Sequence, residues 1–202
     1  MIRTIFLDFG KVLALFDHDL AVTRLMAHCD LSPQQLYEIL YETERFNALE
    51  GGQLDTAEYV RQVRTLAPLT CSDEIFFQHF ADIFTPIDDM CALVPKLAKR
   101  HRLVLASNTN GIHADKFVVD FQPTFAHFQH LVFSHEAKTR KPLADFYTFC
   151  QQFAHCEPRE CLFIDDRADN IAAAREHGWT AIQFQSLEQL LPELKLLRVY
   201  ND

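Results

Sequence analysis

The sequence predicts an α/β protein in which helices cover both faces of a mostly parallel sheet and one helical segment is inserted. Three observations favour this fold class. A short β-prone run opens the chain, residues 17–87 show only helical periods, and β-prone runs then alternate with helical segments to the end. Strands that alternate with helices form right-handed βαβ units, which place the strands side by side and parallel.

The first predicted strand is residues 2–7, IRTIFL, which runs directly into Asp8 and is followed by Phe9, Gly10 and Lys11. An uninterrupted apolar run suits a strand that is buried on both faces of a sheet. In an open α/β sheet, ligands bind at the carboxyl ends of the strands. Asp8 is therefore expected at the functional edge of the sheet.

The segment 17–87 carries signals for helix starts and no strand candidate of comparable strength. Residues with side chains that cap helices stand before amphipathic stretches at Ser32, Asp55 and Ser72. The glycine pair 51–52 interrupts the pattern and predicts a turn or hinge. This segment is therefore expected to form a helical insert of about four helices.

The second half of the chain repeats a strand and a helix several times. Strands are predicted at 102–107, 130–134, 161–165 and 180–184, helices near 89–100, 112–120, 143–154 and 168–177, and one more helix from 186. Since parallel strands end at one edge of a sheet, Asp8, Ser107 and the pair 165–166 are expected around one crevice.

The bulk composition limits the classes of function. The chain has 202 residues, 49% of them hydrophobic, which is ample for a continuous core. The formal net charge of -9 disfavours non-specific attraction to nucleic acid and to anionic membranes. An anionic substrate remains compatible with this charge, because a bound metal or a local cluster of cations inverts the field within one cleft.

The cysteines and the hydropathy indicate a reduced, cytoplasmic protein without a membrane anchor. Six cysteines occur, with no C-x-x-C pair and no zinc-type spacing. They are expected to be reduced thiols that pack as small buried hydrophobic residues. The N-terminus shows no signal-peptide pattern, and no apolar stretch approaches the roughly 20 residues that span a bilayer.

Four strand-end segments resemble, in order, the four motifs of the haloacid dehalogenase superfamily. They are Asp8-Phe9-Gly10-Lys11-Val12-Leu13, Ser107-Asn108-Thr109-Asn110, Lys141-Pro142, and Asp165-Asp166 followed by Asn170. The resemblance covers the whole chain. It implies a Rossmann-like three-layer α/β/α core formed by residues 1–16 and 88–202, and a small helical cap of the C1 type formed by residues 17–87.

The resemblance also implies a chemistry. Asp8 would attack phosphorus in line and form an aspartyl phosphate that water later hydrolyses. A carboxylate that approaches a phosphate meets like-charge repulsion, so a cation is needed, and Mg²⁺ prefers oxygen ligands. The implied magnesium ligands are Asp8, the Gly10 carbonyl, Asp165 and Asp166. Phosphate oxygens would be bound by Ser107, Asn108 and Lys141, with Ser107 and Lys141 also stabilising the transition state.

The sequence departs from the usual phosphatase pattern at Gly10, where most relatives carry a second Asp that acts as general acid and base. Gly at this position, together with Ser-Asn-Thr-Asn in the second motif, resembles the sugar-phosphate phosphatase branch that includes α-D-glucose-1-phosphate phosphatases. A sugar 1-phosphate has a good leaving group, which lessens the need for an acid. Four residues are considered as substitutes without a preference: Lys11, Asp17, His18 and His113.

Several alternatives stay open at this point. Lys138 and Arg140 compete with Lys141 as the phosphate-binding cation, and residues near Arg45, Phe46 and Gly51 are candidates to face the substrate. A metal-free dehalogenase is disfavoured by the acidic pair 165–166. A non-catalytic regulator that has lost its acid is a further alternative. The expected partner is a small phosphorylated metabolite, with no nucleic acid and no membrane, and the sequence does not indicate an oligomeric state.

Overall fold

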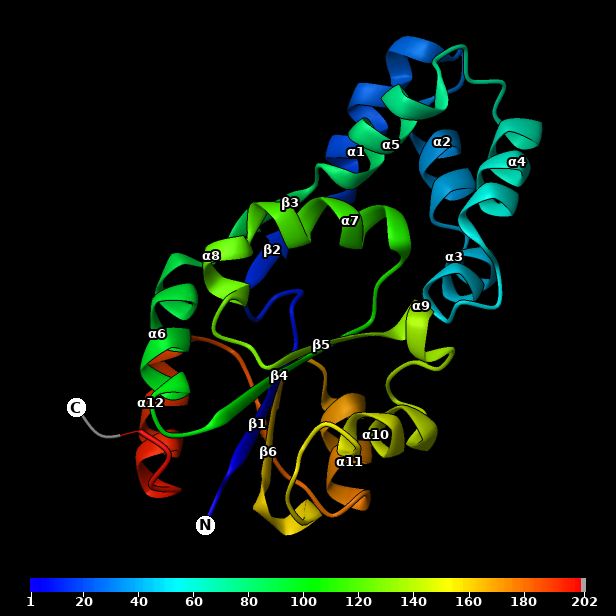
Figure 1. The fold of residues 1–202 in the computed structure, drawn as a ribbon. Helices are drawn as coiled ribbons and strands as arrows, with labels where there is room; N and C mark the ends of the chain where they lie inside the picture. Colours follow the sequence, from blue (N-terminus) through cyan, green and yellow to red (C-terminus); the bar gives the residue numbers. More distant parts are fainter. Residues whose placement is uncertain (201–202) are drawn as a thin grey trace.

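The computed structural model describes residues 1–200 and contains a five-stranded parallel sheet (Figure 1). The strands follow the order β5 (His130–Phe133), β4 (Arg102–Ser107), β1 (Thr4–Leu7), β6 (Cys161–Asp165) and β7 (Thr180–Gln183). In the central register, Phe6 pairs with Val104 on one side and with Phe163 on the other. The predicted α/β fold class is therefore confirmed, and the strand order reverses its direction at β1.

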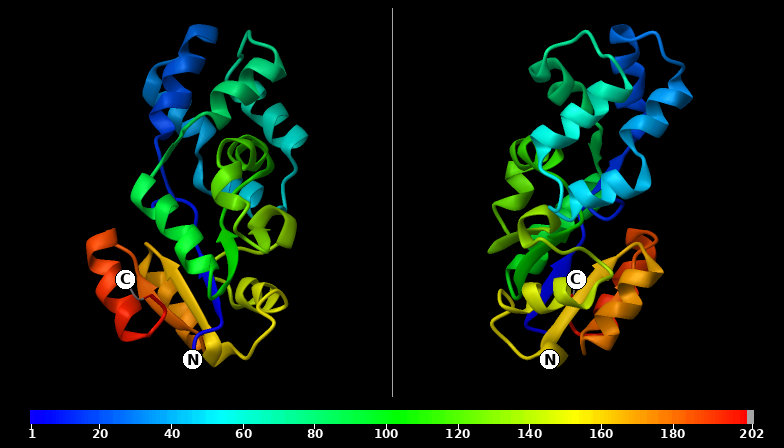
Figure 2. Two further views of the ribbon diagram at one scale, coloured as in Figure 1. Left: turned by 60° about the vertical axis from the view of Figure 1, so that its left-hand side comes forward. Right: turned by 90° about the vertical axis from the view of Figure 1, so that its right-hand side faces the viewer.

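Helices cover both faces of the sheet (Figure 2), and alternate residues of β1 pack against different helix layers. Ile5 and Leu7 pack in one apolar cluster with residues of α6 (Asp88–Ala98), α7 (Gly111–Asp120), α8 (Gln122–Phe125) and α12 (Leu187–Leu196). Phe6 packs in the opposite cluster with residues of α10 (Ala144–Gln151) and α11 (Ala168–Glu176). The sheet is thus covered on both faces, as its continuous apolar strands require.

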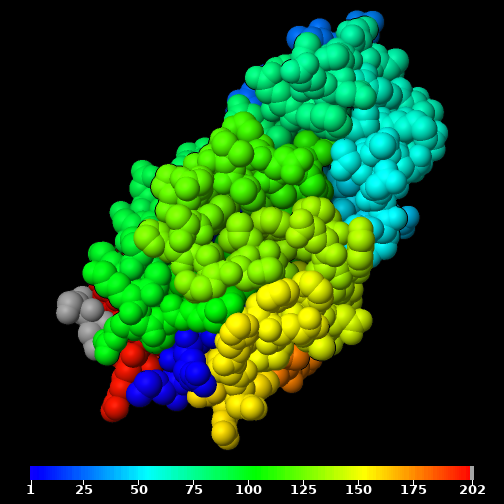
Figure 3. Space-filling model, in the orientation of Figure 1, coloured from blue at the N-terminus to red at the C-terminus, as the bar shows by residue number. Residues whose placement is uncertain are grey.

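A helical insert follows β1 in the chain and forms the upper lobe of the molecule (Figures 1 and 3). Its helices are α1 (His18–Leu25), α2 (Pro33–Leu40), α3 (Thr43–Glu50), α4 (Thr56–Leu66) and α5 (Asp73–Ala81), with a short 3-10 turn at Met26–His28. Ser32, Asp55 and Ser72 each cap a helix with the side chain, as predicted. The insert has its own apolar cluster, which includes Ile112 of α7.

Two short strands connect the insert to the sheet domain and were not anticipated from the sequence. β2 (Ala14–Phe16) leads into the insert, β3 (Phe84–Pro86) leads out of it, and the two pair antiparallel. Each has only three residues, too few for an apolar pattern to reveal. Both chain crossings between the two lobes therefore run through one small ladder.

The remaining differences from the sequence prediction are small. The strand expected at 130–134 ends at Phe133, because Ser134 begins the short helix α9 (Ser134–Ala137). The helix expected at 143–154 ends at Gln151, and a 3-10 turn precedes β6 at Pro158–Glu160.

The structure also shows the state of the cysteines and the length and apolarity of the helices. All six cysteines are free thiols. The sulfurs of Cys156 and Cys161 lie 3.7 Å apart. Within residues 1–200, every helix falls short of the length and apolarity needed to cross a membrane.

Candidate active site

Three carboxylates converge at the carboxyl edge of the sheet. Asp8 follows β1, Asp165 ends the neighbouring strand β6, and Asp166 comes next in the chain. Each offers an oxygen, and these oxygens all lie within 4.8 Å of one another. Asp8 and Asp165 are buried, whereas the side chain of Asp166 is 21% exposed. The two predicted segments thus meet in space although 157 positions separate Asp8 from Asp165.

Lys141 lies between two of these carboxylates. Its Nζ is 2.7 Å from Asp8 Oδ1 and 2.7 Å from Asp165 Oδ2, and its side chain is only 1% exposed. Burial lowers the pKa of Lys141, but the attraction of the Asp165 and Asp8 carboxylates outweighs burial and leaves the pKa raised. Lys141 is therefore a fixed positive charge at the bottom of the site.

The carboxylate cluster carries more negative charge than Lys141 compensates. Burial raises the pKa of Asp8 to about 8, with Lys141 opposing and Asp165 adding to the rise. Burial and the Asp165 carboxylate also raise the pKa of Asp166. Like charges at such distances raise the pKa of one another, and a bound cation would offset this repulsion. The oxygen donor set of Asp8, Asp165 and Asp166 fits a hard divalent cation such as Mg²⁺.

Hydrogen bonds hold Asp165 in one orientation. Asn170 Nδ2 donates to both oxygens of this carboxylate, at 2.9 and 3.0 Å, and the Arg167 backbone N–H donates to Oδ1 at 2.9 Å. The Asn170 contact agrees with the place of this residue in the fourth motif. Asp165 is thus a rigid partner of Lys141 rather than a freely rotating ligand.

The second motif lies beside the carboxylates. Asn108 forms two hydrogen bonds of 2.9 Å with the backbone of Lys141, one donated by Nδ2 to the carbonyl oxygen and one accepted by Oδ1 from the N–H. Its side chain therefore positions Lys141, a contact that the sequence did not predict. Ser107 ends β4, is 2% exposed, and lines a small cavity of about 90 Å³ next to the main one.

Phe16 lies beside Gly10, the position at which the family resemblance implies an acidic side chain. A Cβ atom added at Gly10 would lie 3.0 Å from Phe16 Cε1 and 3.3 Å from Cδ1. The glycines with a positive φ are Gly52 and Gly178, so the backbone at Gly10 does not itself demand glycine. The missing acid is thus linked to the aromatic ring at the end of β2.

The four suggested substitutes for this acid lie in different environments. Lys11 and His18 line the main cavity, and burial lowers the pKa of His18 to about 4. Asp17 instead caps α1 by accepting from the Asp19 N–H. His113 lines the small cavity, and its pKa is lowered by burial to about 3, so it carries no proton to donate as an imidazolium near neutral pH.

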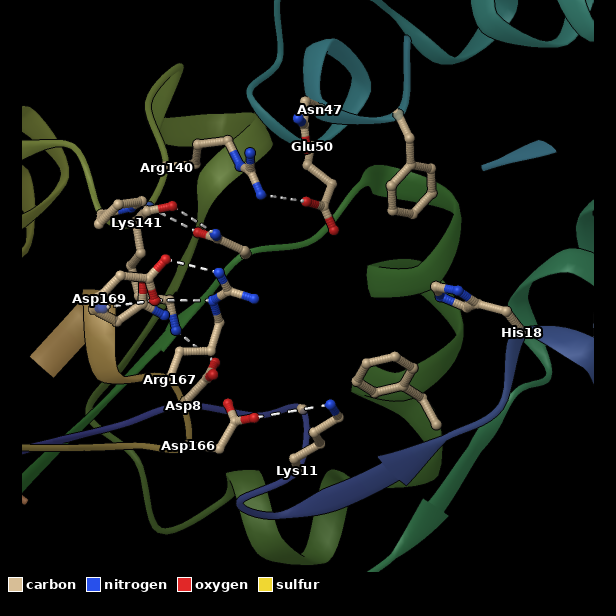
Figure 4. Close-up of a pocket in the computed structure, with 16 residues that line it drawn as sticks. Asp8, Lys11, His18, Asn47, Glu50, Arg140, Lys141, Asp166, Arg167 and Asp169 are labelled. Carbon is tan, nitrogen blue, oxygen red and sulfur yellow. Dashed lines mark hydrogen bonds and ion pairs between the residues drawn. The ribbon is translucent and has the colours of Figure 1, made fainter. Parts of the chain in front are cut away.

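The main cavity has a volume of about 540 Å³ and lies between the carboxylate cluster and the insert (Figure 4). Its lining residues come from both lobes: Asp8, Gly10, Lys11, Phe16, His18, Phe46, Asn47, Glu50, Asn108, Arg140, Lys141, Pro142, Asp166, Arg167, Asp169 and Asn170. Phe46 faces the cavity as suggested from the sequence. Arg45 does not line it and instead donates to the Ile39 carbonyl within the insert, and Gly51 also lies outside the lining.

Sequence reasoning missed an ion pair between the lobes. Arg140 Nη2 lies 3.2 Å from Glu50 Oε2, with the Glu50 side chain 14% exposed. Burial raises the pKa of Glu50, while Arg140 and Lys141 oppose the rise. No short motif could reveal this pair, because its residues are 90 positions apart. Arg140 is accordingly bound to the insert, whereas Lys141 reaches the carboxylates.

Comparison with known proteins assigns the family. The model of the haloacid dehalogenase-like hydrolases matches residues 2–178, so the chain belongs to this hydrolase family. The chain is also similar to D-ribitol-5-phosphate phosphatase of Bacteroides thetaiotaomicron, with 26% identity over 189 residues that cover 91% of this chain and 92% of the relative. The family resemblance read from the four motifs is confirmed.

Solved structures show the same fold. A predicted haloacid dehalogenase-like hydrolase from Porphyromonas gingivalis aligns with a TM-score of 0.81 and 22% identity over 100% of both chains. A haloacid dehalogenase family enzyme from B. thetaiotaomicron, solved with magnesium and inorganic phosphate, aligns with a TM-score of 0.79 and 23% identity over 95% of this chain and 100% of the other.

Proposed function

We propose that this hydrolase is a magnesium-dependent phosphatase that cleaves a small phosphomonoester, such as a sugar or sugar-alcohol phosphate, through an aspartyl phosphate on Asp8. The observation that carries the proposal is the convergence of Asp8, Asp165 and Asp166 at the bottom of one cavity, with Lys141 paired to Asp8 and Asp165. The relative that hydrolyses D-ribitol 5-phosphate and the neighbour solved with magnesium and phosphate support it.

The contacts of Asp8 suit a nucleophile. In residues 1–200, the hydrogen bond from the Phe9 N–H and the ion pair from Lys141 both go to Oδ1, each at 2.7 Å, which leaves Oδ2 for the attack. A bond forms between Oδ2 and phosphorus as the bond from phosphorus to the ester oxygen breaks. Water then attacks the phosphorus of the aspartyl phosphate, and Asp8 and inorganic phosphate are released.

The neighbouring residues supply orientation and charge. A bound Mg²⁺, held by Asp8, Asp166, the Gly10 carbonyl and Asp165 directly or through water, would neutralise the phosphoryl oxygens. Lys141 places a second positive charge beside the attacking carboxylate, and Asn108 fixes the backbone of Lys141. Ser107 and the backbone N–H groups after β4 would donate to the phosphoryl oxygens.

The helical insert is proposed to act as the cap of this enzyme, with residues 17–87 as the cap and residues 1–16 and 88–202 as the catalytic core. The insert supplies Phe46, Asn47 and Glu50 to the cavity wall opposite the carboxylates. Such a wall limits the access of water to the reacting phosphoryl group. The substrate therefore lies between the two lobes.

The test is a hydrolysis assay with p-nitrophenyl phosphate and with a panel of sugar and sugar-alcohol phosphates. We expect turnover with Mg²⁺ that EDTA abolishes and Mg²⁺ restores. Asp8→Asn should lower kcat by at least about 1,000-fold, because the amide cannot form the acyl phosphate. Thermal unfolding of this variant controls for its fold.

The same assay separates the alternatives. Turnover of phosphate esters that persists in EDTA, or in Asp8→Asn, would refute the proposed mechanism. Release of halide from a 2-haloacid without metal would favour a dehalogenase, against the paired acids at Asp165 and Asp166. A folded protein that binds phosphate esters but hydrolyses none of them would be a non-catalytic member of the family.

A further inference from the structure

The part of the cavity beyond the phosphate-binding edge has a mixed wall. Glu50 and Asn47 come from the last two turns of α3 and are polar, whereas Phe16 and Phe46 present aromatic rings. A pocket with a few fixed polar groups and an otherwise apolar wall selects its ligand through those polar groups. The leaving group of the substrate is therefore recognised from the insert.

The net charge of the groups around the cavity favours the binding of one anionic group only. The cationic side chains are Lys11, Arg140, Lys141 and Arg167, and the carboxylates in and beneath the cavity are Asp8, Glu50, Asp165, Asp166 and Asp169. With a bound divalent cation, these charges leave one net positive charge, which a single phosphate dianion more than neutralises. A second phosphate or carboxylate on the substrate would meet net repulsion.

Each cationic side chain is also already engaged. Lys11 Nζ lies 4.0 Å from Asp166, and the Arg167 Nη2 atom lies 2.7 Å from Asp169. Arg140 and Lys141 have the partners described above. The pairs of Arg140 and Lys141 are the shielded ones, and a second anionic group would break them at a cost, so the wall is suited to a neutral leaving group.

Two contacts with the sheet domain position Glu50 at this wall. Its backbone carbonyl accepts a hydrogen bond of 2.6 Å from Ser134 Oγ of the sheet domain, and its Oε2 is paired with Arg140. Figure 4 shows the carboxylate extending from α3 toward the core side of the cavity, with only one oxygen joined to Arg140. The other oxygen, Oε1, is an acceptor for a hydroxyl group, and a carboxylate forms strong hydrogen bonds with hydroxyls.

We propose that the substrate carries a single phosphate on a neutral, polyhydroxylated leaving group, and that Glu50 determines specificity by accepting hydrogen bonds from its hydroxyls. Asn47 adds a second polar contact one turn earlier on α3. Phe16 and Phe46 lie against the carbon skeleton between the hydroxyls. This inference rests on the proposed phosphatase activity and adds the chemical class of the leaving group.

The test compares two substrates in wild type and in Glu50→Gln. For a pentitol or sugar monophosphate, the variant should raise KM about 10- to 100-fold with kcat within about threefold, since a charge-assisted hydrogen bond to the leaving group is weakened. For p-nitrophenyl phosphate, which has no hydroxyl on its ring, kcat/KM should stay within about threefold. Glu44→Gln, on the exposed side of the same helix, is the matched control and should match wild type with both substrates.

A second arm tests the charge argument with wild type alone. A bisphosphorylated sugar and a phosphorylated hydroxy acid should each show a kcat/KM at least about 100-fold below that of the neutral monophosphate. Preference for either acidic substrate would overturn the inference, and so would an equal loss on both substrates in Glu50→Gln. Failure of wild type to hydrolyse p-nitrophenyl phosphate would instead refute the proposed function itself.

Discussion

The two walls of the cavity are built on different principles. At the edge of the sheet, Asp8 and Asp165 stand at strand ends and Lys141 stands in the loop after α9, and their partners lie at 2.7 to 3.0 Å. On the side of the insert, Glu50 and Phe46 stand on one helix that rests on the core through a few contacts. The first wall, at the sheet edge, determines which reaction occurs. The second wall, on the insert, can differ with the leaving group without changing that reaction.

Removing the charge at the centre of the first wall should have the largest effect on the protein. Lys141→Met leaves Asp8 and Asp165 buried without their shared partner, so we expect a loss of stability of about 3–5 kcal/mol. The kcat should fall by about 100- to 1,000-fold, as when one fixed transition-state donor is lost. Urea unfolding and phosphatase kinetics measure the two effects.

Lys99→Met, at an exposed helix end, is the control for this variant and should change neither stability nor kcat appreciably. Unchanged stability in Lys141→Met would show that the buried charge cluster is not what holds the first wall together.

Restoring the missing acid at Gly10 tests whether Phe16 is the group that excludes it. Gly10→Asp alone should gain nothing, because its side chain would meet the Phe16 ring. In the Gly10→Asp and Phe16→Ala double variant, kcat for a primary alkyl phosphate should exceed that of Phe16→Ala by up to about 100-fold, the lower range of general acid catalysis. The measurement is kcat for the four combinations of these two substitutions.

Equal effects of Gly10→Asp with and without Phe16 would contradict the assignment of Phe16 as the group that excludes the acid. A gain confined to substrates with poor leaving groups would agree with it, because those substrates depend most on protonation of the leaving oxygen.

The smallest expected effect concerns the packing between the lobes. His113 is buried, stacks on Phe80 with ring centroids 4.8 Å apart, and has a pKa lowered to about 3. The unfolded chain binds a proton near pH 6.5 and the folded protein does not, so stability is lost as the pH falls from 6.5 toward 3. At pH 5 this loss is about 2 kcal/mol.

His113→Phe should remove this contribution and so reduce the loss of unfolding free energy between pH 7 and pH 5 by about 2 kcal/mol. The comparison with His127→Gln, at a half-buried position outside the junction, controls for other titrating groups. An unchanged slope in His113→Phe would show that the junction tolerates a charged imidazole.

The sequence predicted the first wall far better than the second. Apolar runs that end in Asp8, Ser107 and Asp165 reveal both the strands and the edge where they meet, because strand geometry fixes where each end lies. The pair of Glu50 and Arg140 depends on how the insert rests on the sheet domain, which no local pattern encodes.

The contact between Phe16 and Gly10 was missed for a related reason. At Gly10 the sequence alone shows only that an acidic group is missing. The structure shows an aromatic side chain six positions later that would be in tight contact with any side chain at Gly10. A departure from a motif is therefore informative about its neighbours in space as well as about catalysis.

The β2–β3 ladder has a mechanical consequence. Because both chain crossings are hydrogen-bonded to each other, the two lobes are joined by a single narrow strap rather than by two independent linkers. A rotation about that strap would preserve its short ladder and would separate the lobes first at α3 and α9, where Ser134 holds the Glu50 carbonyl and Lys138 holds the Gly52 carbonyl (Figure 1). The entrance to the cavity thus lies on the side of the lobes away from the β2–β3 ladder, where a few polar contacts hold the lobes together.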